Sequence, residues 1–177
     1  FMAKHGIKGI IGGGAAPGGG SEKVIREWQR VQSQNGIDTD LGGNLCIGFT
    51  FHIADSEEQA IKEAKPFFEE NMKMFGPLGM VKGLTDHQVD QLSKGSDFAR
   101  NANLPTLEQA VESGSWLVGT AESVAEKLME IQDRYPALKS INVGQVIGTP
   151  ENVILEQLER FGKEVMPKVK KEKLAKI

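Results

Sequence analysis

A run of glycines after a short apolar segment is the first candidate for chemistry in this sequence. Ile7–Ile11 is followed by Gly12, Gly13 and Gly14, and then by a loop with further glycines. A dinucleotide-binding turn needs the pattern G-x-G-x-x-G, but Pro17 stands where the third glycine would be. A triphosphate-binding loop needs a lysine and a hydroxyl residue at a spacing that this stretch does not have. We therefore expect neither a Rossmann-type site nor a nucleoside triphosphate site.

The residue types that ligate metals or carry nucleophilic catalysis are scattered along the chain. His5, His52 and His87 are far apart in the sequence, and none stands at metal-ligand spacing from Cys46. No arrangement of serine, histidine and aspartate stands out. The sequence therefore predicts no metal site and leaves the catalytic residues unknown.

Composition limits the class of protein. The chain has 177 residues, 39% of them hydrophobic and 25% charged, which is enough for one hydrophobic core. A net charge of −3 gives no basic surface for nucleic acid. No apolar run approaches the roughly 18–20 residues that cross a bilayer, and no secretory signal is visible at the start. A single cysteine excludes an internal disulfide framework and favours the cytoplasm as the location.

The pattern of apolar residues predicts alternating strands and helices. We expect strands at Ile7–Ile11, Leu45–Ile53 and Lys139–Val146. Helical spacing after capping residues predicts helices over 21–35, 56–75, 120–135 and 150–167. Thr149 is expected to cap the last of these helices and Pro167 to end it. Its buried face is expected to consist of Ile154, Leu158, Phe161 and Val165. Strands joined by helical crossovers are normally parallel, so the fold class is α/β.

Residues 76–115 differ from the rest of the chain. Glycines and prolines interrupt them, and two capping-box patterns, at Thr85 and at Thr106, each precede only about two turns of helix. We interpret this segment as an insertion of short helices. Insertions of this length in compact domains are commonly lids or interaction segments.

Four stretches of the sequence carry a family resemblance. They are AKHGI (3–7), HIADSEEQAIKEAKP (52–66), WLVGTAESVAEKL (116–128) and GTPENVILEQLERFGKEVMP (148–167). In order and spacing they resemble the C-terminal half of the bacterial luciferase-like monooxygenases, which are flavin-dependent (β/α)8 barrels. The third stretch resembles the family's VGTPEEVAEKL, with Ala121 where the family often has proline. Residues 77–115 match only loosely.

The resemblance implies a partial (β/α)8 barrel. Residues 1–177 would form the C-terminal part of a single barrel domain, with a helical, lid-like insertion at 76–115. The expected strands would be barrel strands 6, 7 and 8, parallel neighbours in that order, with helices on the outer side only. A chain that starts in the last turn of a helix, before a turn at Gly6, fits a piece of a longer protein.

The resemblance also implies a flavin site at the C-terminal ends of the strands. The part of the family that lies along the flavin ring matches Gly9, Ile10, Ile11, Gly12 and Gly13. A backbone without Cβ lets an aromatic ring approach closely, although an ordinary strand-to-helix turn would explain the same glycines. Only one of Ile10 and Ile11 can face the barrel interior, because side chains alternate along a strand.

The activity implied by the resemblance is oxidation of a small organic substrate with reduced FMN and oxygen. The cofactor carries most of this chemistry, while the protein orients it and excludes water. A dehydrogenase that uses the deazaflavin coenzyme F420 is the nearest alternative, and a non-catalytic, flavin-free paralogue that acts as a dimerisation partner is another. The family's catalytic groups and phosphate clamp lie largely in its N-terminal half, so no catalytic residue is named.

Candidate substrate contacts come from the insertion and from the last strand. Met80, Val81 and Leu84 are expected to present apolar side chains from the insertion. Gln145 and Asn142, near the end of the last strand, would either contact a substrate or bond neighbouring loops. The resemblance further implies a homodimer and a flavin reductase as the supplier of reduced flavin, with no nucleic-acid or membrane partner.

Overall fold

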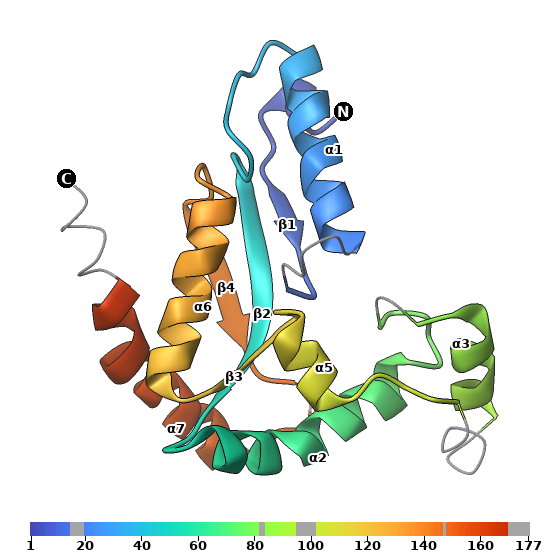
Figure 1. Cartoon of the computed structure of the whole chain (residues 1–177). Helices are drawn as coiled ribbons and strands as arrows, with labels where there is room; N and C mark the ends of the chain where they lie inside the picture. Colours follow the sequence, from blue (N-terminus) through green and yellow to red (C-terminus); the bar gives the residue numbers. More distant parts are fainter. Residues whose placement is uncertain (15–19, 82–83, 95–101, 147, 170–177) are drawn as a thin grey trace.

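Four parallel strands form a sheet at the centre of the computed structural model (Figure 1). The structure describes residues 1–14, 20–81, 84–94, 102–146 and 148–169. The strands are β1 (Gly9–Ile11), β2 (Leu45–Ile53), β3 (Trp116–Gly119) and β4 (Ser140–Gly144).

The long β2 holds the sheet together, because every other strand pairs with it. Cys46 pairs with both β1 and β4, so these two strands lie on opposite edges of β2. Thr50 pairs with both β3 and β4, so β3 lies on the same edge as β1 and continues it toward the carboxyl end. The expected parallel order of the first, second and last predicted strands is confirmed. The short strand β3 was not predicted.

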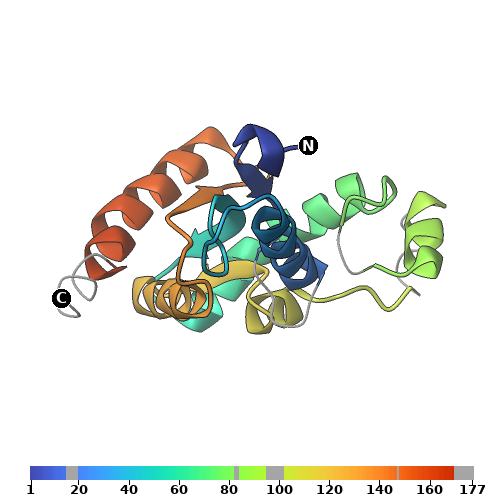
Figure 2. The ribbon, with the colours of Figure 1, turned by 90° about the horizontal axis from the view of Figure 1, so that it is seen from above.

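Helices connect these strands and extend around them (Figures 1 and 2). They are α1 (Gly20–Gln34), α2 (Glu57–Phe75), α3 (Asp86–Ser93), α5 (Leu107–Glu112), α6 (Ala121–Arg134) and α7 (Glu151–Arg160), with a short 3₁₀ helix, η1 (Ala3–His5), before β1 and a π-helical segment, η2 (Phe161–Val165), after α7. Both capping boxes predicted in the insertion form, at Thr85 before α3 and at Thr106 before α5.

The main hydrophobic core lies on one face of the sheet, under α1, α6 and η2. The odd-numbered residues of β2 point into it, because side chains alternate along a strand. They meet Ile25 of α1, Leu128 of α6 and Val165 of η2. Each fully buried side chain of this kind contributes about 1.5–3 kcal/mol to folding. This layer corresponds to the outer, helix-covered face expected for a barrel.

A second core lies on the other side of β3, where α2 and α5 pack. Trp116 and Val118 belong to this core, whereas Leu117 between them belongs to the first. The rings of Trp116 and Phe68 lie 5.2 Å apart in a T-shaped arrangement. The expectation that helices lie only on the outer side is therefore wrong for α2 and α5. In Figure 1, α2 passes across the carboxyl end of β2 instead.

The last helix differs from its prediction at both ends. It begins after Pro150, and the buried hydroxyl of Thr149 caps nothing in the described part of the chain. The helix also continues past Pro167 to residue 169, after the π-helical turn of η2. A π turn loosens the helix just before the residue that cannot donate a backbone hydrogen bond. Phe161 is buried as predicted, but Leu158 is 45% exposed.

Candidate functional site

The carboxyl end of β1 and Thr50, inside β2, border a cavity of about 580 Å³, which we call the strand-end pocket. The turn after β1, Thr50 of β2 and Trp116 of β3 form one side of it, and α2 and α5 form the other. The stretch that follows α2 contributes a further wall. Parallel α/β folds bind ligands at this end of their strands, so the strand-end pocket is the candidate site.

Four residues that the sequence analysis proposed for the site line the strand-end pocket. They are Gly12 and Gly13 from the predicted flavin wall, and Met80 and Val81 from the predicted substrate contacts. The two groups are separated by more than sixty positions in the sequence, and the fold brings them to one cavity. Catalytic residues and cofactor contacts are not identified by this placement.

The other proposed residues on β1 lie outside the strand-end pocket. Ile11 is only 7% exposed and belongs to the main core, whereas Ile10 is 78% exposed on the opposite face of the strand. Ile10 is therefore the one that faces away from the helical layer. At Gly9, an added Cβ would lie 2.6 Å from Leu45, because the chain packs closely there.

Leu84 and Gln145 are also placed elsewhere. Leu84 packs against the second core. The side-chain amide of Gln145 donates a hydrogen bond to the carbonyl oxygen of Phe51, at 2.7 Å. Of the two roles considered for Gln145, the structure thus shows the bond to neighbouring backbone.

The glycine turn after β1 has two different environments. A Cβ added at Gly12 would meet no atom within 4 Å. Gly14 has a φ of 74°, and its N–H donates a hydrogen bond to the carbonyl oxygen of Gly48 at 2.9 Å. A Cβ added at Gly14 would lie 2.5 Å from the Cα of Ser115. Gly14 therefore fixes the turn against the segment before β3, while Gly12 presents bare backbone to the strand-end pocket.

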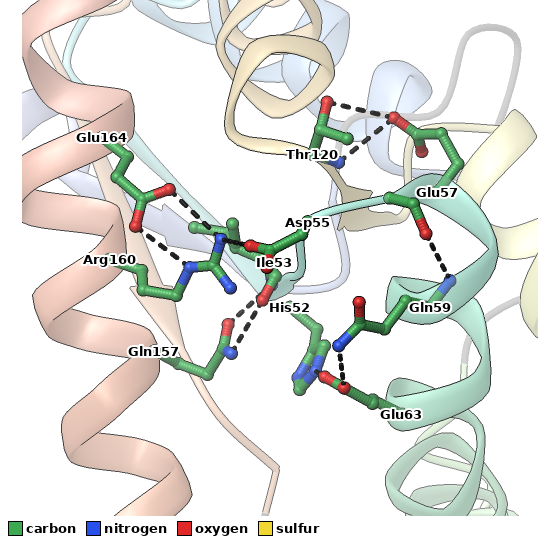
Figure 3. A network of polar contacts seen from close by, with 11 residues as sticks. His52, Ile53, Asp55, Glu57, Gln59, Glu63, Thr120, Gln157, Arg160 and Glu164 are labelled. Atoms are coloured by element: carbon green, nitrogen blue, oxygen red, sulfur yellow. Dashed lines mark hydrogen bonds and ion pairs between the residues drawn. The ribbon is translucent and has the colours of Figure 1, made fainter.

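Polar contacts connect the end of β2 to α2, and α2 to the start of α6 (Figure 3). The buried His52 ring lies with Nε2 3.0 Å from Glu63, which also accepts a hydrogen bond from Gln59 at 2.7 Å. At the start of α6, the backbone N–H of Thr120 donates to the carboxylate of Glu57 at 3.1 Å. Sequence analysis did not find these contacts, because Glu, Gln and Thr on a helix normally face solvent.

The same end of β2 is connected to α7 (Figure 3). The buried side chain of Gln157 accepts from the backbone N–H of Ile53 at 2.6 Å and donates to its carbonyl oxygen at 3.0 Å. Arg160 donates to Asp55 at 2.8 Å and to Glu164 at 3.1 Å. Together, these contacts connect the carboxyl end of β2 to α2 and α7.

The hydrogen bond from His52, followed by that from Gln59, holds the pKa of Glu63 below its usual value of 4.5. A lowered pKa in the folded state stabilises the fold above pH 4.5, and this contribution is lost as the pH falls through the folded pKa. We expect Glu63→Gln to lower the free energy of unfolding by at most about 1 kcal/mol at pH 7, because the Glu63 side chain is 43% exposed.

The pH profile provides the test of the Glu63 prediction. In urea unfolding, the difference between Glu63→Gln and the unaltered protein should shrink below pH 4. Glu58→Gln, which removes an exposed carboxylate from the same helix, serves as the charge control. A difference that stays constant from pH 7 to pH 3 would contradict the assignment.

Another cleft lies between the end of β2, the start of α6 and the helix of η2. Its lining cations, Arg160, Lys163 and Lys168, each pair with a carboxylate. The charges in this cleft are thus compensated within the protein, and it is a weaker candidate than the strand-end pocket.

Within residues 1–14, 20–81, 84–94, 102–146 and 148–169, no group of three or more His, Cys, Asp or Glu side chains could hold a metal ion. In those same ranges no helix is both long and apolar enough to cross a membrane.

Comparison with solved structures shows the fold. The monooxygenase RslO1 from Streptomyces bottropensis superposes with a TM-score of 0.62 at 17% identity, over 94% of this chain and 43% of that one. The oxygenating constituent of 3,6-diketocamphane monooxygenase from Pseudomonas putida, a type II Baeyer–Villiger enzyme solved with FMN, gives 0.62 at 18% identity, over 95% and 44%. The coenzyme F420-dependent tetrahydromethanopterin reductase from Methanopyrus kandleri gives 0.58 at 19% identity, over 94% and 47%.

The chain thus spans less than half the length of each of these solved structures. Its fold is α/β with a parallel sheet and corresponds to part of a (β/α)8 barrel. No match was found among curated proteins. The family model of the luciferase-like monooxygenases matches residues 1–137. The chain therefore belongs to the luciferase-like monooxygenase family.

Proposed function

We propose that the protein is a flavin-dependent monooxygenase that acts on a small organic substrate with reduced FMN and oxygen. The observation that carries this proposal is that two residues without a side chain, Gly12 and Gly13, line the strand-end pocket, with open space where Gly12 would carry a Cβ. Its membership of the luciferase-like monooxygenases and the FMN bound in the Pseudomonas putida neighbour support it. The activity is proposed for the whole protein, of which this chain provides the C-terminal part of the barrel.

The residues of the strand-end pocket fit a flat aromatic cofactor. Gly12 leaves open space where any other residue would place a Cβ, so a ring can lie against the backbone there. Trp116 and Phe68 provide apolar walls, and Thr50 and Asn71 provide polar edges. When bound, reduced flavin supplies the electrons for oxygen activation. The chain's own side chains would position the ring and keep water out of the site.

A deazaflavin-dependent dehydrogenase is the second candidate, because the Methanopyrus kandleri neighbour uses coenzyme F420. The two cofactors share a flat tricyclic ring, and the bare backbone at Gly12 would admit either. Titration with FMN and with F420 in parallel discriminates between them. For the monooxygenase we further propose a homodimer in the cytoplasm that receives reduced flavin from a reductase.

We also propose that part of residues 76–115 acts as a lid over the strand-end pocket. The segment has two different halves. Leu107 and Ala110 of α5 are buried in the second core, so α5 is part of the packed structure. In contrast, α3 lies well away from the sheet in both Figure 1 and Figure 2. Among the described residues, the lid would therefore consist of 76–81 and 84–94, which include Met80 and Val81; residues 82–83 and 95–101 of the predicted insertion lie outside the described part of the chain.

Gly12→Val tests the proposed cofactor wall. The branched side chain would occupy the space of the ring, and overpacking of this kind costs about 1–3 kcal/mol, which corresponds to roughly a tenfold to hundredfold loss in FMN affinity. Fluorescence titration with FMN measures the loss. The fold should be intact, because a Cβ at Gly12 meets no neighbour.

Gly144→Val is the matched control for this titration. Gly144 has equally open space but does not line the strand-end pocket, so its variant should bind FMN as the unaltered protein does. Thermal melts check that both variants fold. Unchanged FMN affinity in a folded Gly12→Val protein would remove the glycine turn from the cofactor site.

A further inference from the structure

The strand-end pocket has a composition that selects among organic substrates. Resting on the function proposed above, we infer that it takes a neutral, largely apolar substrate with a hydrogen-bond acceptor such as a carbonyl oxygen, and that it discriminates against carboxylates and sulfonates. The family resemblance leaves the substrate open, so the inference rests on the lining of this chain.

Aromatic and thioether side chains provide the large apolar groups of the lining. Phe68, Met72 and Trp116 are buried side chains of this lining. Phe75 and Met80 also line the pocket, and Met80 is 64% exposed. Methionine side chains are flexible and polarisable, so they adapt to apolar ligands of different shape. A hydrocarbon portion of a substrate would therefore be well accommodated.

Among the residues that the structure describes, no charged side chain lines the strand-end pocket. Two ionic residues that flank Asn71 and Met72 along α2, Glu70 and Lys73, pair with each other, and both side chains are 61% exposed. Transfer of a carboxylate into an apolar site without a charged partner is much less favourable than transfer of a neutral group. An anionic substrate would leave its solvation shell without compensation here.

The polar groups of the lining suit a neutral acceptor. The hydroxyl groups of Ser113 and Ser115 already donate to the carbonyl oxygen of Ala110, at 3.1 and 3.0 Å. The side-chain oxygen of Gln109 accepts from the backbone of Thr106, so its NH₂ group is the part left to donate. Amide N–H groups of this kind hold a carbonyl oxygen, but they do not neutralise a full negative charge.

Two ten-carbon ligands, one neutral and one anionic, provide the test: 2-decanone and decanoate at pH 8. Trp116 lines the pocket and is one of only two tryptophans in the chain. In a Trp28→Phe background, its fluorescence therefore reports ligand binding directly. We expect saturable binding of 2-decanone, at least tenfold tighter than that of decanoate.

Asn71→Lys extends the test to a gain of binding. Asn71 lines the pocket from α2, and lysine is well tolerated in a helix. The new ammonium should raise decanoate affinity at least tenfold. Met74→Lys is the control, because it adds the same charge to an exposed position of α2 that does not line the pocket, and it should leave decanoate affinity within threefold.

Three results would overturn the inference: binding of neither probe, equal or tighter binding of decanoate by the unaltered protein, and no gain for decanoate in Asn71→Lys. A separate FMN titration keeps the two proposals distinguishable. Lack of FMN binding with the expected probe preference would overturn the proposed function alone. FMN binding with a preference for decanoate would overturn the substrate inference alone.

Discussion

Replacing Gln157 with leucine is expected to lower the free energy of unfolding by about 2–6 kcal/mol, because each of two buried backbone groups left without a partner costs about 1–3 kcal/mol. The groups are the N–H and the carbonyl oxygen of Ile53, and both bond to the Gln157 side chain (Figure 3). Ile53 is fully buried and Gln157 is 2% exposed, so water cannot replace these bonds.

The reason for this arrangement is the length of β4. The strand's pairing with β2 ends at Thr50, although β2 continues to Ile53. Beyond that point, Gln145 bonds the carbonyl oxygen of Phe51, and Gln157 bonds both backbone groups of Ile53. Two glutamine side chains thus continue the hydrogen-bonding ladder where the neighbouring strand has stopped.

Urea unfolding at pH 7 measures the Gln157→Leu effect, and two other variants calibrate it. Gln145→Leu removes one bond and should cost about 1–3 kcal/mol. Leu158→Gln changes the exposed neighbour and should stay within about 0.5 kcal/mol. A Gln157→Leu protein as stable as Leu158→Gln would show that Gln157 does not hold the end of β2.

The strands show how far the sequence predicts this fold. The limits of β2 were predicted correctly, because large apolar residues alternate along it from Leu45 to Ile53 and turn residues flank it. The strand β3 was missed, because its four residues run directly into the cap of α6 and give no separate signal. Its place also depends on β1 ending early and leaving an edge of β2 free, which is a property of the assembled sheet rather than of any local stretch.

The last helix shows a second limit of periodicity. Sequence spacing placed Leu158 on the buried face, but the structure buries Gln157 instead. A glutamine that satisfies buried backbone cannot be told from a solvated one by hydrophobicity. A signal was nevertheless present: Gln157 stands three residues after Ile154 and four before Phe161, on the stripe that packs inward.

The candidate site was also predicted only in part from the sequence. Gly12, Gly13, Met80 and Val81 were singled out from the sequence and lie around one pocket. The residues of α2 and α5 that complete the pocket were not singled out from the sequence. Aromatic and methionine residues at helical spacing are normally interpreted as part of the hydrophobic core. Their role becomes visible only when the sheet places the glycine turn opposite them.

The glycine turn leads to the second large expected effect. Gly14→Ala should lower the free energy of unfolding by about 2–5 kcal/mol, as the sum of two costs. A left-handed backbone costs a residue with Cβ roughly 1–2 kcal/mol, and the φ of Gly14 is 74°. Overpacking adds about 1–3 kcal/mol.

The overpacking at Gly14 is against backbone, which cannot rotate away as a side chain can. The new Cβ would lie 2.5 Å from the Cα of Ser115, 2.7 Å from its carbonyl oxygen and 2.8 Å from the carbonyl oxygen of Gly114. Relief requires the turn after β1 to separate from the segment before β3. Gly13 and Ser115 both line the strand-end pocket, so the same movement would also change its shape.

Gly12→Ala is the matched control, two residues earlier in the same turn. Its Cβ meets no atom within 4 Å, so its stability should be unchanged or higher by up to about 1 kcal/mol through the reduced entropy of the unfolded chain. Urea unfolding of the two variants measures the difference, and Trp116 fluorescence reports the pocket in the same samples. If Gly14→Ala were as stable as Gly12→Ala, the glycine turn would not be fixed against Ser115. The turn could then not form the wall of the strand-end pocket in the way that the structure shows.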